Sequence, residues 1–155
     1  MAPSRMNLLL IPGFMLDADL WRDMRAALAE IGDVVLADLT RDDTLGGMAD
    51  RAIAALSRPA LVVGFSMGGY VAREIAYRAP DRVAGLALVA TSSRAHGPQP
   101  GLPDPAEFRQ IGRAAVMRSL HPDHGSDANI QRVQAMSRRA GRCRVCAAGR
   151  TGSPR

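Results

Sequence analysis

The sequence predicts an α/β fold in which a parallel β-sheet carries helices on both faces. Short apolar runs alternate with longer stretches of helical periodicity, which is the pattern of strand-helix-strand units. The runs are apolar throughout and do not alternate with polar residues, as is typical of strands buried on both faces. At 155 residues the chain is long enough for one domain that buries roughly 70% of its extended-chain surface.

Each predicted element follows from its local pattern. Asp17 and Thr44 are suited to cap helices, and Gly32 and Pro80 are suited to mark where helices stop. Strands are predicted over residues 8–11, 34–37, 60–64 and 85–90, with helices between them over 17–31, 45–56 and 67–78. Asp38, Asp42 and Asp43 follow the second strand, where we expect them to shape a turn.

The second half of the chain changes character twice. A loop rich in proline and glycine spans 97–103, and two amphipathic patterns follow at 105–120 and 127–139. From Gly141 onward there is no apolar period and no acidic residue, so this part cannot contribute to a core. We therefore predict a core over residues 6–96, the start of a helical cap over 97–140, and a disordered Arg-rich tail over 141–155.

The net charge of +5 is concentrated at one end of the chain. Residues 1–137 hold 14 Arg and 15 acidic residues, whereas residues 138–155 hold six Arg and no acid. Without interleaved aromatic residues, such a tail predicts only nonspecific contact with nucleic acid. No apolar run approaches a membrane span or a secretory signal, so the predicted location is cytoplasmic with no membrane partner.

The most informative motif is Gly64-Phe65-Ser66-Met67-Gly68, which joins the third predicted strand to the third helix. A serine on such a sharp turn is held clear of the backbone, and glycines at its flanks remove side chains that would obstruct the turn. A phosphate-binding glycine loop is the competing interpretation, but the motif lacks its Gly-Lys-Ser/Thr ending. The pattern favours a nucleophile elbow.

This motif and the strand-loop Leu8–Phe14 resemble those of the α/β-hydrolase family, particularly its esterase-like members with a helical cap; the resemblance spans about residues 6–140. It implies that Ser66 is the nucleophile. It also implies an oxyanion hole built from the backbone N–H of Met67 and one from the first strand-helix loop, where Phe14 is the preferred donor and Met15 the alternative. No metal or organic cofactor is implied.

The same family places an acid and then a histidine after the cap, in further strand-helix units that this sequence does not contain. We therefore expect a C-terminally truncated hydrolase, with a frameshift near residue 141 as the hypothesis for the change in character. The complete hydrolase would act on a small ester or acyl compound. The catalytic activity of this chain would be weak or absent. The alternative is a non-catalytic binding protein that retains the fold.

Several other residues were weighed as functional. His96 follows the fourth strand and is a rescue candidate for the missing base, against the simpler interpretation of a solvated loop histidine. His121-Pro122-Asp123-His124 is expected to be a turn between helices and not a metal site. Cys143 and Cys146 form a lone Cys-x-x-Cys, taken as accidental spacing. If the sheet ends at residues 85–90, its exposed edge predicts self-association.

Overall fold

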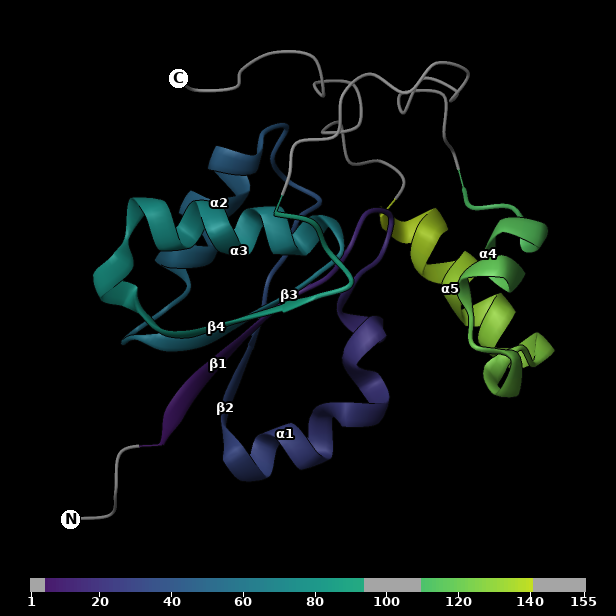
Figure 1. Ribbon diagram of the computed structural model, residues 1–155, viewed down its shortest axis with the longest axis horizontal. Coiled ribbons are helices and arrows are strands. Elements are labelled where there is room, and N and C mark those ends of the chain that lie inside the picture. The colour runs from purple at the N-terminus through teal and green to yellow at the C-terminus, as the bar shows by residue number, and fades with distance from the viewer. Residues whose placement is uncertain (1–4, 94–109, 141–155) are drawn as a thin grey trace.

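The computed structural model describes residues 5–93 and 110–140. Its centre is a four-stranded parallel sheet in the order β2-β1-β3-β4, with helices on both faces (Figure 1). The predicted class is therefore confirmed. The strands are β1 (Met6–Ile11), β2 (Gly32–Leu36), β3 (Ala60–Phe65) and β4 (Val83–Val89).

The pairing of β1 with β3 determines where the carboxyl ends of the strands meet. Leu10 pairs with Val63 and Ile11 with Gly64, so both strands end at the same edge of the sheet. Adjacent parallel strands bring their carboxyl ends to one edge of the sheet. The loop after β1 and the turn after β3 are therefore adjacent.

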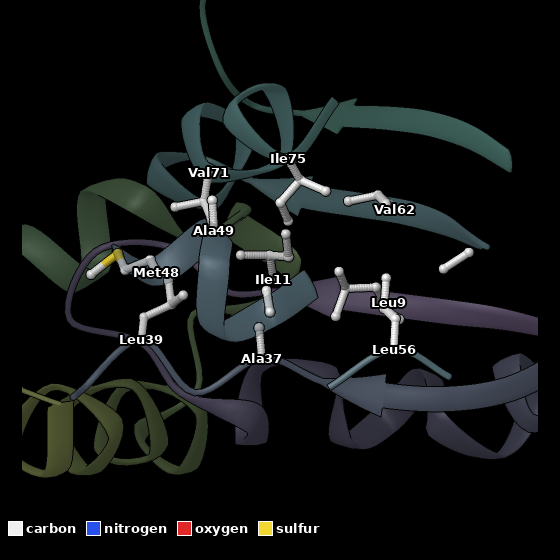
Figure 2. Packing of buried hydrophobic residues seen from close by; sticks show 13 residues of the cluster. Leu9, Ile11, Ala37, Leu39, Met48, Ala49, Leu56, Val62, Val71 and Ile75 are labelled. Carbon is white, nitrogen blue, oxygen red and sulfur yellow. The ribbon is translucent and has the colours of Figure 1, made fainter. Parts of the chain in front are cut away.

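One face of the sheet is covered by α2 (Leu45–Ala54) and α3 (Met67–Arg78). Figure 2 shows the side chains that these helices and strands bury together. Leu9, Ile11 and Val62 point from the strands towards Met48 and Ala49 of α2 and Val71 and Ile75 of α3, and all seven are fully buried. Burial of apolar surface on this scale is the main source of stability, at about 25 cal/mol per Å².

The opposite face is covered by η1 (Ala18–Met24) and α1 (Arg25–Ile31). Leu8 and Leu10 of β1 pack here with Trp21 of η1, and Leu28 of α1 packs against them. The two faces of β1 are thus both buried, as its unbroken run of apolar residues requires.

Several element boundaries differ from the sequence predictions. The single helix predicted over 17–31 is a 3-10 helix followed by an α-helix. The α-helix ends at Gly32, as predicted, and β2 begins at the same residue. The predicted helix over 105–120 begins only at Arg113, and its first five residues lie outside the described part of the chain. Thr44 does cap α2, since its hydroxyl accepts a 3.0 Å hydrogen bond from the amide of Gly47.

Beyond the carboxyl end of the sheet lie α4 (Arg113–Ser119), η4 (Pro122–His124) and α5 (Asp127–Ala140) (Figure 1). The expected turn between the two amphipathic helices is η4. The hydroxyl of Ser137 on α5 accepts a hydrogen bond of 2.6 Å from the amide of Ile111, which ties the segment before α4 to α5. These elements form a helical unit that contacts η1.

β4 forms one edge of the sheet. Leu86, Leu88 and Val89 are 41%, 41% and 44% exposed, and the strand carries no charged residue. The other edge strand, β2, carries Asp33, which is paired with Arg58. Charged residues on an edge strand discourage its pairing with a strand of another chain. β2 carries such a residue, and β4 does not.

The fold predicts a large cost for a methyl group at Gly68. Its Cβ would lie 2.4 Å from the carbonyl oxygen of Pro12 and 2.5 Å from that of Ile11. We expect Gly68→Ala to lower the free energy of unfolding by about 1–3 kcal/mol, because backbone must move to accommodate it. Urea denaturation measures the change.

The matched control is Gly112→Ala, since a Cβ at Gly112 meets nothing within 4 Å. We expect that change to stay within about 1 kcal/mol of the unmodified chain. Equal effects of the two substitutions would contradict the proposed steric role of Gly68.

Candidate active site

Ser66 stands between the end of β3 and the beginning of α3. Its backbone has φ 53° and ψ −118°, a conformation that residues with a side chain rarely adopt. Its amide donates to the carbonyl oxygen of Val89 at 2.9 Å, and its carbonyl accepts from the amide of Gly69 at 2.9 Å. The backbone groups of Ser66 are thus satisfied by β4 and α3, while the residue itself is only half-buried.

Glycines flank Ser66 at positions where backbones meet. A Cβ at Gly64 would lie 2.4 Å from the carbonyl oxygen of Gly68, the second residue of α3. Gly68 in turn lies against the carbonyls that end β1. Glycine at both positions therefore allows the start of α3 to approach β3 and β1 closely, as the sequence motif predicted on steric grounds.

The loop after β1 reaches the same place. A Cβ at Gly13 would lie 3.2 Å from Cβ of Ser66 and 3.1 Å from Cδ1 of Phe65. The turn continues with the amide of Leu16 donating to the carbonyl oxygen of Gly13 at 3.2 Å. The loop that holds Phe14 and Met15 therefore begins in contact with Ser66, and the amide of Met67 is next along the chain from that serine. Phe14 and Met67 as oxyanion donors remain a prediction.

Backbone strain is concentrated at this edge of the sheet. Within the described residues, three that are not glycine have positive φ: Met15 at 54°, Ser66 at 53° and Ala90 at 49°. They follow β1, β3 and β4, which are neighbours in the sheet. Such conformations cost about 1–3 kcal/mol each and cluster at functional sites. Of these three residues, only Ser66 could be predicted from the sequence to lie at a sharp turn, because a methionine or an alanine gives no signal for positive φ.

Within residues 5–93 and 110–140, no hydrogen bond joins the hydroxyl of Ser66 to a histidine or an acid. The candidate His96 lies outside these ranges. Asp38 accepts hydrogen bonds from both the amide and the hydroxyl of Thr40. Burial raises the pKa of Asp38, but these hydrogen bonds and the charges of nearby arginines lower it by a larger amount. The pKa of Asp38 is therefore below its ordinary value. Asp38 thus shapes a turn, as predicted.

An open cleft of about 480 Å³ lies between η1, the start of α1 and the end of α5. Its lining is mainly charged and does not include Ser66: Asp17, Ala18, Asp19, Arg22, Arg25 and Arg139. Asp17, which caps η1, receives hydrogen bonds from Nε and Nη2 of Arg139 at 2.6 and 3.2 Å. These residues are separated by 122 positions, and no local pattern in the sequence indicates the pair.

His121, Asp123 and His124 lie together at η4, where the two imidazole centroids are 6.0 Å apart. Across the described ranges no cluster of three or more His, Cys, Asp or Glu side chains is arranged to hold a metal ion. Cys143 and Cys146 lie outside those ranges. A search of the described helices also found none with the length and apolar character of a membrane span.

Comparison with known proteins identifies the family. The family model described as "alpha/beta hydrolase fold" matches residues 7–143. The chain is 34% identical over 97 residues to the pimeloyl-[acyl-carrier protein] methyl ester esterase of Edwardsiella ictaluri, covering 57% of this chain and 38% of that protein. It is 36% identical over 106 residues to the enzyme of that name from Sodalis glossinidius, covering 62% and 41%. The chain thus spans about two fifths of the length of these relatives.

Solved structures agree with the sequence comparison. A thermophilic esterase from Thermogutta terrifontis superposes with a TM-score of 0.65 at 26% identity, covering 93% of this chain and 62% of that one. The epoxide hydrolase CorEH gives a TM-score of 0.71 at 22% identity, covering 95% and 67%, a likeness that concerns the fold. The parallel sheet, the strand-serine-helix turn and the match over residues 7–143 lead to one conclusion: this chain belongs to the α/β-hydrolase family.

Proposed function

We propose that this chain is a serine hydrolase of the carboxylesterase type, which uses Ser66 as nucleophile on a small ester or acyl substrate. The observation that carries the proposal is the backbone of Ser66, held at φ 53° and ψ −118° between β3 and α3. Strain of this kind is retained where surrounding structure enforces it, and it presents the serine hydroxyl at the carboxyl edge of the sheet. Named esterases among the relatives support the same reaction class.

In the proposed reaction, Oγ of Ser66 attacks the carbonyl carbon of the ester and its proton passes to a base. The negative charge that develops on the carbonyl oxygen is held by the backbone N–H groups of Phe14 and Met67. Collapse of the tetrahedral intermediate expels the alcohol, which takes up a proton, and leaves an acyl group on Ser66. Water then attacks this acyl-enzyme, releases the carboxylic acid and restores the serine hydroxyl.

The rate depends on the base. A serine hydroxyl is a weak nucleophile at its ordinary pKa, and the described residues supply no histidine bonded to Ser66. Oxyanion donors and substrate binding alone typically retain about 10³–10⁴-fold acceleration over water. We therefore propose a weak hydrolase in the chain as given, with a non-catalytic binding protein as the alternative that the lack of a bonded base favours.

The relatives narrow the substrate class. Two of them are named for the methyl ester of a pimeloyl group on an acyl-carrier protein, which is a carboxylic ester of an acyl chain. We propose a carboxylic ester for this chain too, with no metal, organic cofactor or specific nucleic acid involved. The proposed location is the cytoplasm, and the exposed apolar side chains of β4 favour self-association.

We further propose a division of the chain that follows its change in character. Residues 6–96 would form the hydrolase core and residues 97–140 the start of a cap over the carboxyl edge of the sheet. The position of α4 and α5 beyond that edge (Figure 1) supports this arrangement. The third predicted unit, the Arg-rich tail over residues 141–155, lies outside the described residues.

The proposal predicts covalent labelling of Ser66. A fluorophosphonate probe should react in a saturable manner and form an adduct that peptide mass spectrometry assigns to this residue. Ser66→Ala should abolish the adduct, while Ser57→Ala, at an exposed serine of an ordinary loop, should not change it. Added imidazole should speed the hydrolysis of a chromogenic acetate ester beyond the rate with imidazole alone, and this excess should be lost in Ser66→Ala, because imidazole supplies a base to the serine. An unlabelled but folded chain would favour the binding protein.

The strain at Ser66 predicts that function costs stability. Ser66→Gly should raise the free energy of unfolding by up to about 2 kcal/mol, because glycine adopts positive φ freely and this gain exceeds its entropic cost. Ser66→Ala, which keeps the Cβ, should show no such gain. Thermal unfolding of the two variants and the unmodified chain measures the difference, and a Ser66→Gly variant that melts earlier than Ser66→Ala would argue against strain.

A further inference from the structure

Two arginines of α5 hold that helix against η1. Arg139 binds Asp17 and also lies 3.4 Å from a carboxylate oxygen of Asp19, at the beginning of η1. Arg132 binds the carboxylate of Asp23, near the end of η1, at 2.8 Å. The two ends of η1 are therefore fastened to one helix that lies more than 100 residues away in the chain.

The spacing of the charges on the two elements matches. Arg132 and Arg139 are seven positions apart in α5, which places them on one face about 10 Å apart. Asp17 and Asp23 are six positions apart, which along a 3-10 helix is about 12 Å. Arg139, near the end of α5, pairs with Asp17 at the start of η1, and Arg132, earlier in α5, pairs with Asp23 near the end of η1. The two elements therefore lie antiparallel.

Asp17 connects this contact to the loop that begins beside Ser66. Its Oδ1 accepts from the amide of Asp19 at 2.9 Å, and its carbonyl oxygen accepts from the amide of Leu20 at 3.1 Å. It follows Met15, with its positive φ, by two residues. The loop is thus fixed at one end by β1 and at the other by Asp17.

We propose that Arg139 is a positioning residue, which holds the 13–17 loop in the conformation that presents its backbone N–H groups towards the substrate carbonyl at Ser66. Docking of α5 and assembly of the oxyanion hole are then one event. Arg139 contacts no reacting atom; it acts through Asp17. The role in catalysis rests on the proposed function, whereas the effect on the loop does not.

The electrostatics favour Asp17 as the anchor. Burial raises the pKa of Asp17, but the hydrogen bonds from Arg139 and from the amide of Asp19, with the charges of Arg139 and Arg22, lower it by more. The hydrogen bond that Arg139 donates to Asp17 is the main cause of the raised pKa of Arg139. The carboxylates of Asp17 and Asp19 are 23% and 17% exposed, whereas that of Asp23 is 70% exposed. A bidentate guanidinium contact also fixes orientation, which a single point charge does not.

The experiment compares Arg139→Gln with the matched control Arg132→Gln, which breaks the other contact between α5 and η1 without touching Asp17. The first readout is amide hydrogen exchange at Phe14, Met15 and Leu16, measured by NMR on the full chain. Arg139→Gln should speed exchange at these amides about tenfold, and Arg132→Gln by less than about twofold. Arg139→Lys keeps the charge but cannot make the bidentate contact, so its exchange rates should lie between those of the two glutamine variants. It replaces Arg139→Gln in the comparison if that variant does not fold.

The second readout is the second-order rate at which a fluorophosphonate labels Ser66. Arg139→Gln should lower it about tenfold, and should have no further effect in an Asp17→Asn background, because residues that act through one contact are not additive. Equal effects of the Arg139 and Arg132 variants on exchange would overturn the proposal. Unchanged labelling alongside faster exchange would limit Arg139 to the loop and overturn its role in catalysis.

The two proposals fail in distinguishable ways. If the unmodified chain is not labelled, the proposed function fails, and the exchange rates alone decide whether Arg139 positions the loop. If labelling occurs and the Arg139 variants match the controls in both readouts, the proposed function stands and the positioning role is rejected.

Discussion

The close approach of three backbone segments is the constraint on which the rest of this structure depends. The start of α3 lies against the end of β1, and Gly68 leaves no room for a side chain between them. Gly64 allows the turn after β3 to fold back on α3 in the same way. With the segments this close, the backbone at Ser66 is forced to positive φ, and the loop after β1 is brought against the serine. The geometry of the site is a consequence of packing within the core.

This constraint explains why strain is gathered at one edge. The hydrophobic cluster beneath α2 and α3 packs β1 and β3 together (Figure 2), and the conformational cost falls on the turns that leave β1, β3 and β4. Met15, Ser66 and Ala90 carry it. A well-packed interior can offset a few strained residues because their cost is small beside the free energy of burying an entire apolar face. The same edge faces α5, whose charged contacts with η1 lie outside this apolar core.

Much of this arrangement could be predicted from local patterns. Unbroken apolar runs identified the four strands, and glycines around a serine identified the strand-turn-helix motif, because both depend on neighbouring residues. Element boundaries were less accurate: residues 17–31 form a 3-10 helix and an α-helix, a division that hydrophobic periodicity does not encode. Phe14 and Met67 as oxyanion donors remain predictions, because both are main-chain groups whose direction no side chain reveals.

The sequence by itself determined the class of fold, the parallel order of its units and the serine at its sharpest turn, since these follow from hydrophobic periodicity and from the unique steric freedom of glycine. Only the tertiary structure decided that Met15 and Ala90 share the strain of Ser66 and that Arg139 reaches Asp17 across 122 positions. The physical reason is that both arise from contacts between segments distant in the chain. A single sequence has no local signal for such contacts. The residues that flank an arginine or an alanine in the chain are the same whether or not it contacts a distant segment.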